Sequence, residues 1–221
     1  MTVTVTVTGL TRAAGLAAAA SGLLFGFVQF IHPAETVAAV TTTGWAVTHY
    51  LTLLMAVLGL AGTAGLYLSQ ARRVGVAGLV GWLAFSGFYL VTTAYTFVEA
   101  FVLPELAGTA PGVAAEILAI PGGGDTGDLG AVAMVGPASF ALYLVGGVLL
   151  GITLFRARVL ARWASALLAV GPVLTLAAPL VPHSLLRLAA LPVAVALIGL
   201  GVSLWQGRPE TTPVVDAPAV R

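Results

Sequence analysis

Six long apolar runs alternate with short breaks that carry polar residues or proline. A helix needs about 20 mostly apolar residues to cross the roughly 30 Å hydrocarbon core of a bilayer, and each run is about that long. The pattern therefore predicts an all-α integral membrane bundle of six transmembrane helices. The predicted spans cover residues 13–32, 45–69, 75–102, 130–155, 160–180 and 184–206.

Three segments fall outside these spans. Residues 1–12 are predicted to be a flexible cytoplasmic tail, and residues 207–221, which contain three prolines, a disordered one. Residues 13–206 form one transmembrane domain. A long extracytoplasmic loop, about residues 103–129, connects the third span to the fourth. Within it, residues 111–120 are apolar but too few to cross a membrane, and they predict a short helix at the interface.

The arginines set the predicted orientation, because cytoplasmic loops near span ends are enriched in basic residues. With six spans, both termini and two of the interhelical loops lie on one side. That side holds all of the arginines except Arg187, namely Arg12, Arg72, Arg73, Arg156, Arg158, Arg162, Arg208 and Arg221. Both termini are therefore predicted to be cytoplasmic, in a bacterial inner membrane.

Composition narrows the function classes. Hydrophobic residues make up 59% of the chain and charged residues 8%, whereas a soluble domain carries about 25% charged residues. This balance excludes a soluble enzyme, a nucleic-acid binder and a disordered chain. The absence of cysteine excludes thiolate catalysis and cysteine-ligated metal centres. The absence of lysine excludes a Schiff base and a P-loop.

One carboxylate, Glu99, lies inside the third predicted span. A carboxylate at that depth is costly unless it faces the bundle interior or water, and by default it marks a functional site. Thr92, Tyr95 and Thr96 precede it at spacings that place all four on one helical face. Similar polar stripes occur toward the outer ends of spans one, two and four. Together they predict a polar pocket in the outer half of the bundle, lined by Gln29, His32, Trp45, His49, Thr92, Phe88, Tyr95, Tyr143 and Glu99.

Acid–base chemistry on a lipophilic small molecule is the leading interpretation of this pocket. Glu99 would act as proton donor or acceptor, with His49 or Tyr95 as relay. Gln29, Trp45, Thr92, Phe88 and Tyr143 would bind the substrate. The reaction would be that of an intramembrane cyclase, isomerase or hydrolase.

Metal-assisted chemistry is an alternative. His32, His49 and His183 could hold a divalent metal ion, since three histidines and a water form a common catalytic zinc site. Haem between His32 and His49 fits less well, because only Arg187 is near to pair with its propionates. The cofactor is left open.

Two non-enzymatic interpretations also stay open. An intramembrane glutamate and histidine suit a proton-coupled small-molecule transporter, and the same stripes could pack a non-catalytic haem- or lipid-binding subunit of a membrane complex. The expected partners are membrane lipids and a lipophilic small molecule, and a homo-oligomer is not excluded.

Three short motifs suggest a family. The run Ile31-His32-Pro33, the pair Trp45 and His49, and the run Gly65-Leu66-Tyr67 are similar to those of bacterial multi-span membrane proteins of unknown function. The resemblance covers roughly the first three spans. It implies that His32 and His49 are features of such a family, and it implies no reaction.

Overall fold

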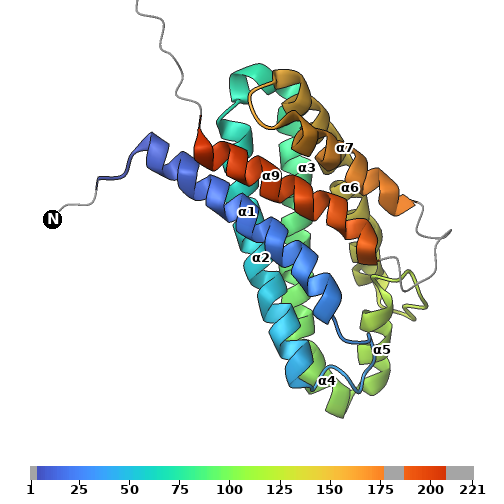
Figure 1. The fold of residues 1–221 in the computed structure, drawn as a ribbon. Helices are drawn as coiled ribbons and strands as arrows, with labels where there is room; N and C mark the ends of the chain where they lie inside the picture. The colour runs from blue at the N-terminus through green and yellow to red at the C-terminus, as the bar shows by residue number, and fades with distance from the viewer. Residues whose placement is uncertain (1–3, 177–186, 208–221) are drawn as a thin grey trace, which may run out of the picture.

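The computed structural model describes residues 4–176 and 187–207, and this part of the chain is helical without a β-strand. Six of its helices pack side by side in a closed ring, in which α1 contacts α2 and α9, α3 contacts α2 and α6, and α7 contacts α6 and α9 (Figure 1). These helices are α1 (Val7–Ile31), α2 (Thr43–Leu68), α3 (Ala71–Phe97), α6 (Val135–Ala157), α7 (Arg162–Leu174) and α9 (Leu191–Gln206).

Five helical segments are long and apolar enough to cross a membrane. They contain α1, α2, α3, α6 and α9, in agreement with five of the predicted spans. The described part of the fifth predicted span contains α7, an apolar helix of 13 residues. The remainder of that span and the predicted start of the sixth lie outside the described residues. The fold is thus a helical bundle with several membrane-spanning helices.

The first helix begins earlier than its hydropathy predicts. It starts at Val7, because the hydroxyl of Thr6 accepts from the backbone N–H of Gly9 at 3.0 Å and caps the helix. The predicted flexible tail over residues 1–12 is therefore wrong for residues 7–12. The third helix starts at Ala71 but breaks at Gly75, whose φ of 61° favours glycine, so its regular part follows that residue as expected.

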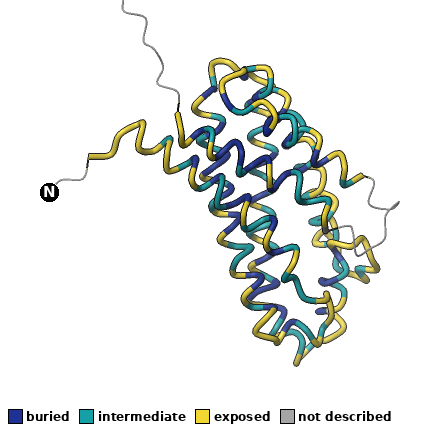
Figure 2. Tube along the Cα trace, viewed as in Figure 1, coloured by how far each residue is buried: buried dark blue, intermediate teal, exposed yellow. Residues whose placement is uncertain are grey.

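Close helix packing explains the many glycines of the bundle core. A Cβ added at Gly62 of α2 would lie 2.5 Å from the backbone nitrogen of Ala18 in α1, and one added at Gly15 would lie 2.6 Å from that of Trp205 in α9. Small residues let backbones approach this closely in membrane bundles. Figure 2 shows the buried positions along the inner sides of the helices and the exposed ones outside.

The end of the bundle after α3 has a small apolar core of its own. The chain continues from α3 into a π-helix, η1 (Val98–Val102), and then into α4 (Leu103–Thr109) and α5 (Pro111–Ala119). The sequence predicted α5 but neither the π-helix nor α4. Ile117 and Leu118 of α5 pack with Trp45 of α2 and Leu103. In this way the predicted interfacial helix covers one end of the bundle.

Two short helices complete the described structure. A 3₁₀ helix, η2 (Gly130–Met134), leads into α6, and another, η4 (Arg187–Ala190), leads into α9. Six arginines of the described chain gather at one end of the bundle. Arg12, Arg72, Arg73, Arg156, Arg158 and Arg162 belong to the start of α1, the start of α3 and the α6–α7 connection, at the end opposite α4 and α5 (Figure 1).

Candidate functional site

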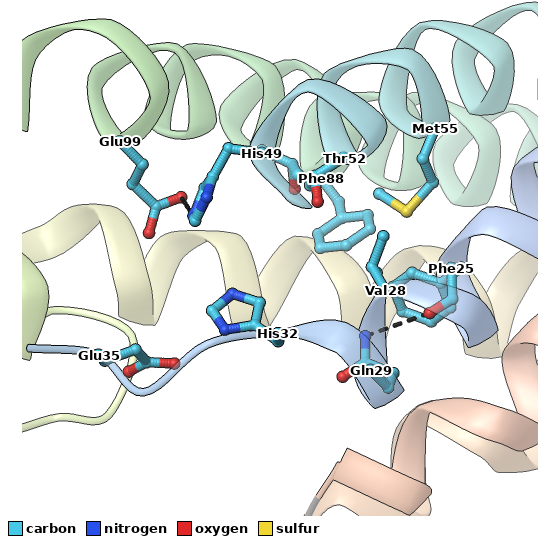
Figure 3. Close-up of a pocket in the computed structure, with 11 residues that line it drawn as sticks. Phe25, Val28, Gln29, His32, Glu35, His49, Thr52, Met55, Phe88 and Glu99 are labelled. Atoms are coloured by element: carbon cyan, nitrogen blue, oxygen red, sulfur yellow. Dashed lines mark hydrogen bonds and ion pairs between the residues drawn. The ribbon is translucent and has the colours of Figure 1, made fainter. Parts of the chain in front are cut away.

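A pocket of about 300 Å³ lies between the last turns of α1, the first half of α2 and the second half of α3 (Figure 3). These segments meet at the end of the bundle that α4 and α5 cover. The lining side chains are Phe25, Val28, Gln29, His32, Glu35, His49, Thr52, Met55, Phe88, Thr92 and Glu99. The polar stripes of the first three spans therefore converge on one cavity.

His49 and Glu99 face each other at the edge of this pocket. Nε2 of His49 lies 3.6 Å from Oε2 of Glu99, and both residues are buried, with exposed fractions of 1% and 9%. No hydrogen bond reaches this Nε2 from the described residues. The predicted meeting of the carboxylate with an imidazole of the second span is confirmed.

The hydrogen bond of the other ring nitrogen, Nδ1, determines the tautomer of neutral His49. Nδ1 lies 2.7 Å from the backbone oxygen of Trp45, and because a carbonyl oxygen only accepts, Nδ1 carries the hydrogen and donates it. In neutral His49 the lone pair is therefore on Nε2, on the side of Glu99.

Trp45 holds both members of this pair. Its indole ring stacks on the His49 imidazole with centroids 4.1 Å apart, and its Nε1–H donates to the backbone oxygen of Glu99 at 2.8 Å. The side chain is fully buried. Such a support, made of a stacked ring and two hydrogen bonds, restricts the relative positions of the two titratable groups.

The π-helix explains why the backbone carbonyl of Glu99 has no backbone N–H donor. In an α-helix its oxygen would accept from the N–H of Leu103, but that N–H donates to Val98 instead. In the π pattern the donor would be residue 104, which is a proline without an N–H. The indole N–H of Trp45 takes the place of the missing backbone donor.

His32 brings a second imidazole to the pocket. Its ring lies 5.4 Å from the His49 ring, centroid to centroid, in an edge-on arrangement, and its Nδ1 donates to the backbone oxygen of Pro33 at 3.0 Å. Within the described residues no group of three or more His, Asp or Glu side chains is placed to hold a metal ion. His183, the third predicted metal ligand, lies outside the described residues, so the metal set stays a prediction.

Three of the predicted site residues do not line the pocket. Tyr95 points away from it, because its hydroxyl donates to the backbone oxygen of Ile117 in α5 at 2.6 Å. Trp45 supports the pocket from behind His49. Tyr143 of α6 packs against Phe85 and Phe88 in the main core, and no described group accepts from its hydroxyl. These three side chains are not among the lining residues, whereas Gln29, Phe88 and Thr92 are. The relay role of Tyr95 and the substrate contacts of Trp45 and Tyr143 stay predictions that this cavity does not support.

Several lining residues were not singled out by the sequence. Val28 and Met55 are apolar, and in sequence an apolar residue that lines a cavity is indistinguishable from one that faces lipid. Glu35 is exposed, as expected for a loop residue, but it also borders the pocket mouth. Its place three residues after His32 is the signal that could have found it.

In comparisons with protein-family models, with curated proteins and with solved structures, no match to this chain is found. The resemblance of the first three spans to multi-span membrane proteins of unknown function therefore stays a prediction.

Proposed function

We propose that this chain is an integral membrane enzyme that carries out acid–base chemistry on a lipophilic small molecule. The substrate occupies the pocket between α1, α2 and α3, and the His49–Glu99 pair gives or takes the proton. The observation that carries this proposal is the 3.6 Å approach of His49 Nε2 to the Glu99 carboxylate at the edge of a cavity. A buried imidazole and carboxylate beside a cavity are candidates for general acid and base.

The two ends of the pocket support a substrate that is largely apolar. Figure 3 shows Glu35, His32, His49 and Glu99 at one end. Apolar side chains gather at the other end, from Phe25, Val28, Met55 and Phe88. A lipophilic body would be bound by the apolar end while the reacting group meets the imidazole and the carboxylate.

A transporter is the rival proposal, and the packing of the bundle argues against it. A carrier needs a path from the pocket to the opposite side of the membrane. Beyond the pocket, α1 and α2 touch at Gly62 and Ala18, and α1 and α9 touch at Gly15 and Trp205, with no room for an added methyl group. This tight half of the bundle favours a site that opens to one side.

The charge distribution supports an orientation. Except for Arg187, the described arginines lie at the end opposite the pocket, and basic residues favour the cytoplasmic side. The pocket then lies in the outer half of a bacterial inner membrane, with both termini in the cytoplasm, and six spans complete the topology.

The proposal is tested by solvent isotope incorporation. The purified full-length protein is incubated with a total lipid extract of its source membranes in D₂O and H₂¹⁸O, and the products are analysed by mass spectrometry. The wild-type protein introduces deuterium or ¹⁸O into a lipophilic compound. Glu99→Gln and His49→Phe lower this incorporation by about 10²–10⁴-fold, the typical contribution of a positioned acid or base.

Glu105→Gln is the matched control, because Glu105 is an exposed carboxylate of α4 outside the pocket. It keeps wild-type incorporation. Equal incorporation by wild type and Glu99→Gln contradicts the proposed enzyme. Proton movement into protein-containing vesicles that depends on a gradient of an extract compound, without any isotope incorporation, favours the transporter instead.

A further inference from the structure

At the polar end of the pocket, the groups of His49, Glu35 and Glu99 that face the cavity are acceptors. Nδ1 of His49 donates its hydrogen to Trp45, which leaves Nε2 as an acceptor, and the hydroxyl of Thr52 donates to the backbone oxygen of Thr48 at 2.9 Å. Two carboxylates, Glu35 and Glu99, add only acceptor oxygens when ionised. The hydrogens of His49 Nδ1 and of the Thr52 hydroxyl are thus donated to the backbone, and His49 Nε2 and the carboxylate oxygens remain as acceptors.

The charged side chains that line the pocket also favour a positively charged ligand. The chain has no lysine, and no arginine is among the side chains that line the pocket in the described structure. Two carboxylates therefore face the cavity without an arginine or lysine beside them there. A ligand with a positive, hydrogen-donating head complements both the charge and the acceptor pattern.

A head group of this kind also explains the spacing of the buried pair. Nε2 of His49 and Oε2 of Glu99 are 3.6 Å apart, just beyond hydrogen-bond reach of one another, and His49 Nε2 has no partner within the described residues. Two acceptors at this separation can both accept from one ammonium group, which has three N–H donors and no acceptor.

We infer that the substrate is a lipophilic amine, bound in its protonated form. The ammonium group lies among Glu35, Glu99 and His49, and the apolar body lies against Phe25, Met55 and Phe88. The aromatic rings at this end also suit an aromatic body. The amine inference rests on the proposed function, because it takes the same pocket as the substrate site.

Three probes of nearly equal size and different head groups test the inference. They are 2-phenylethylamine, 2-phenylethanol and phenylacetate, and their binding to the purified full-length protein in detergent is measured by isothermal titration calorimetry. The amine binds with a Kd at least about tenfold below that of the alcohol, the effect of one hydrogen-bonded charge, and phenylacetate binds more weakly than either.

Glu35→Gln separates the head-group effect from the pocket itself. Glu35 borders the mouth and is exposed, so its amide variant keeps the shape of the site. The variant weakens amine binding about tenfold and leaves the alcohol unchanged, whereas the control Glu105→Gln changes neither. An alcohol or acid that binds as tightly as the amine overturns the inference, as does the absence of saturable amine binding.

The failure of the amine inference is distinguishable from that of the proposed function. If Glu99→Gln abolishes isotope incorporation but the alcohol binds as well as the amine, the protein is still the proposed enzyme, and its substrate belongs to another class. Unchanged incorporation in Glu99→Gln removes the enzyme whatever the three probes do.

Discussion

The indole N–H of Trp45 donates to the backbone oxygen of Glu99 at 2.8 Å and so joins two residues that are 54 positions apart in sequence. The same indole ring stacks on His49. Because Pro104 cannot supply the backbone N–H that the π-helix would require, this bond replaces a missing hydrogen bond at the residue that carries the buried carboxylate. The π-helix and Pro104 thus leave the Glu99 carbonyl without a backbone donor, and Trp45 contacts both members of the proposed catalytic pair.

Trp45→Phe is expected to destabilise the protein by about 1–3 kcal/mol, because it leaves the buried Glu99 carbonyl without its donor while a ring still stacks on His49. Isotope incorporation falls as well, since Glu99 is less firmly placed. Thermal unfolding in one detergent measures the first effect. Trp82→Phe is the matched control, because the buried Nε1 of Trp82 has no described hydrogen-bond partner. An equal loss of stability in both variants would contradict this role of Trp45.

Tyr95→Phe is expected to loosen α5 and to leave the proton chemistry largely intact. The variant loses the 2.6 Å hydrogen bond to Ile117, at a cost of about 1 kcal/mol, and Tyr95 does not line the pocket. Hydrogen exchange of the α5 amides, Pro111–Ala119, increases while isotope incorporation stays near the wild-type rate. A large loss of incorporation with unchanged exchange would restore the proton relay that the sequence predicted for Tyr95.

Tyr143→Phe is expected to leave both stability and probe binding unchanged or slightly improved. Its hydroxyl is buried without a described partner, so removing the oxygen removes a desolvated polar group. Calorimetry with 2-phenylethylamine and thermal unfolding provide the measurements. Weaker binding of the probe would show that Tyr143 does contact the ligand.

Gly62→Ala is expected to lower stability by about 1–3 kcal/mol, because the new methyl group would lie 2.5 Å from the backbone of Ala18 and would separate α1 from α2. Gly108→Ala in α4 is the control, since nothing lies within 4 Å of a Cβ at that position. Thermal unfolding of the two variants should differ clearly. Similar midpoints would mean that the α1–α2 contact is looser than the structure has it.

Several features follow from the sequence because they depend on composition and helical period alone. A transmembrane helix must satisfy its backbone hydrogen bonds internally, so length and hydropathy suffice to predict the five helices that are long and apolar enough to cross a membrane. The 3.6-residue period places Gln29 with His32, and Thr92 with Glu99, on single faces. A buried carboxylate must face the interior, which is why the approach of Glu99 to His49 could be expected.

The tertiary structure alone decided which side chains line the cavity. A helical period gives the direction of a side chain relative to its own helix, but not which neighbour it meets. Tyr95 therefore hydrogen-bonds to α5, and Tyr143 packs in the main core. Trp45 stacks on the ring of His49. The π-helix before Pro104 shifts the helical register at Glu99 itself, and the Trp45 indole that completes it comes from a different helix. Such a contact between distant segments exists only once the helices have packed.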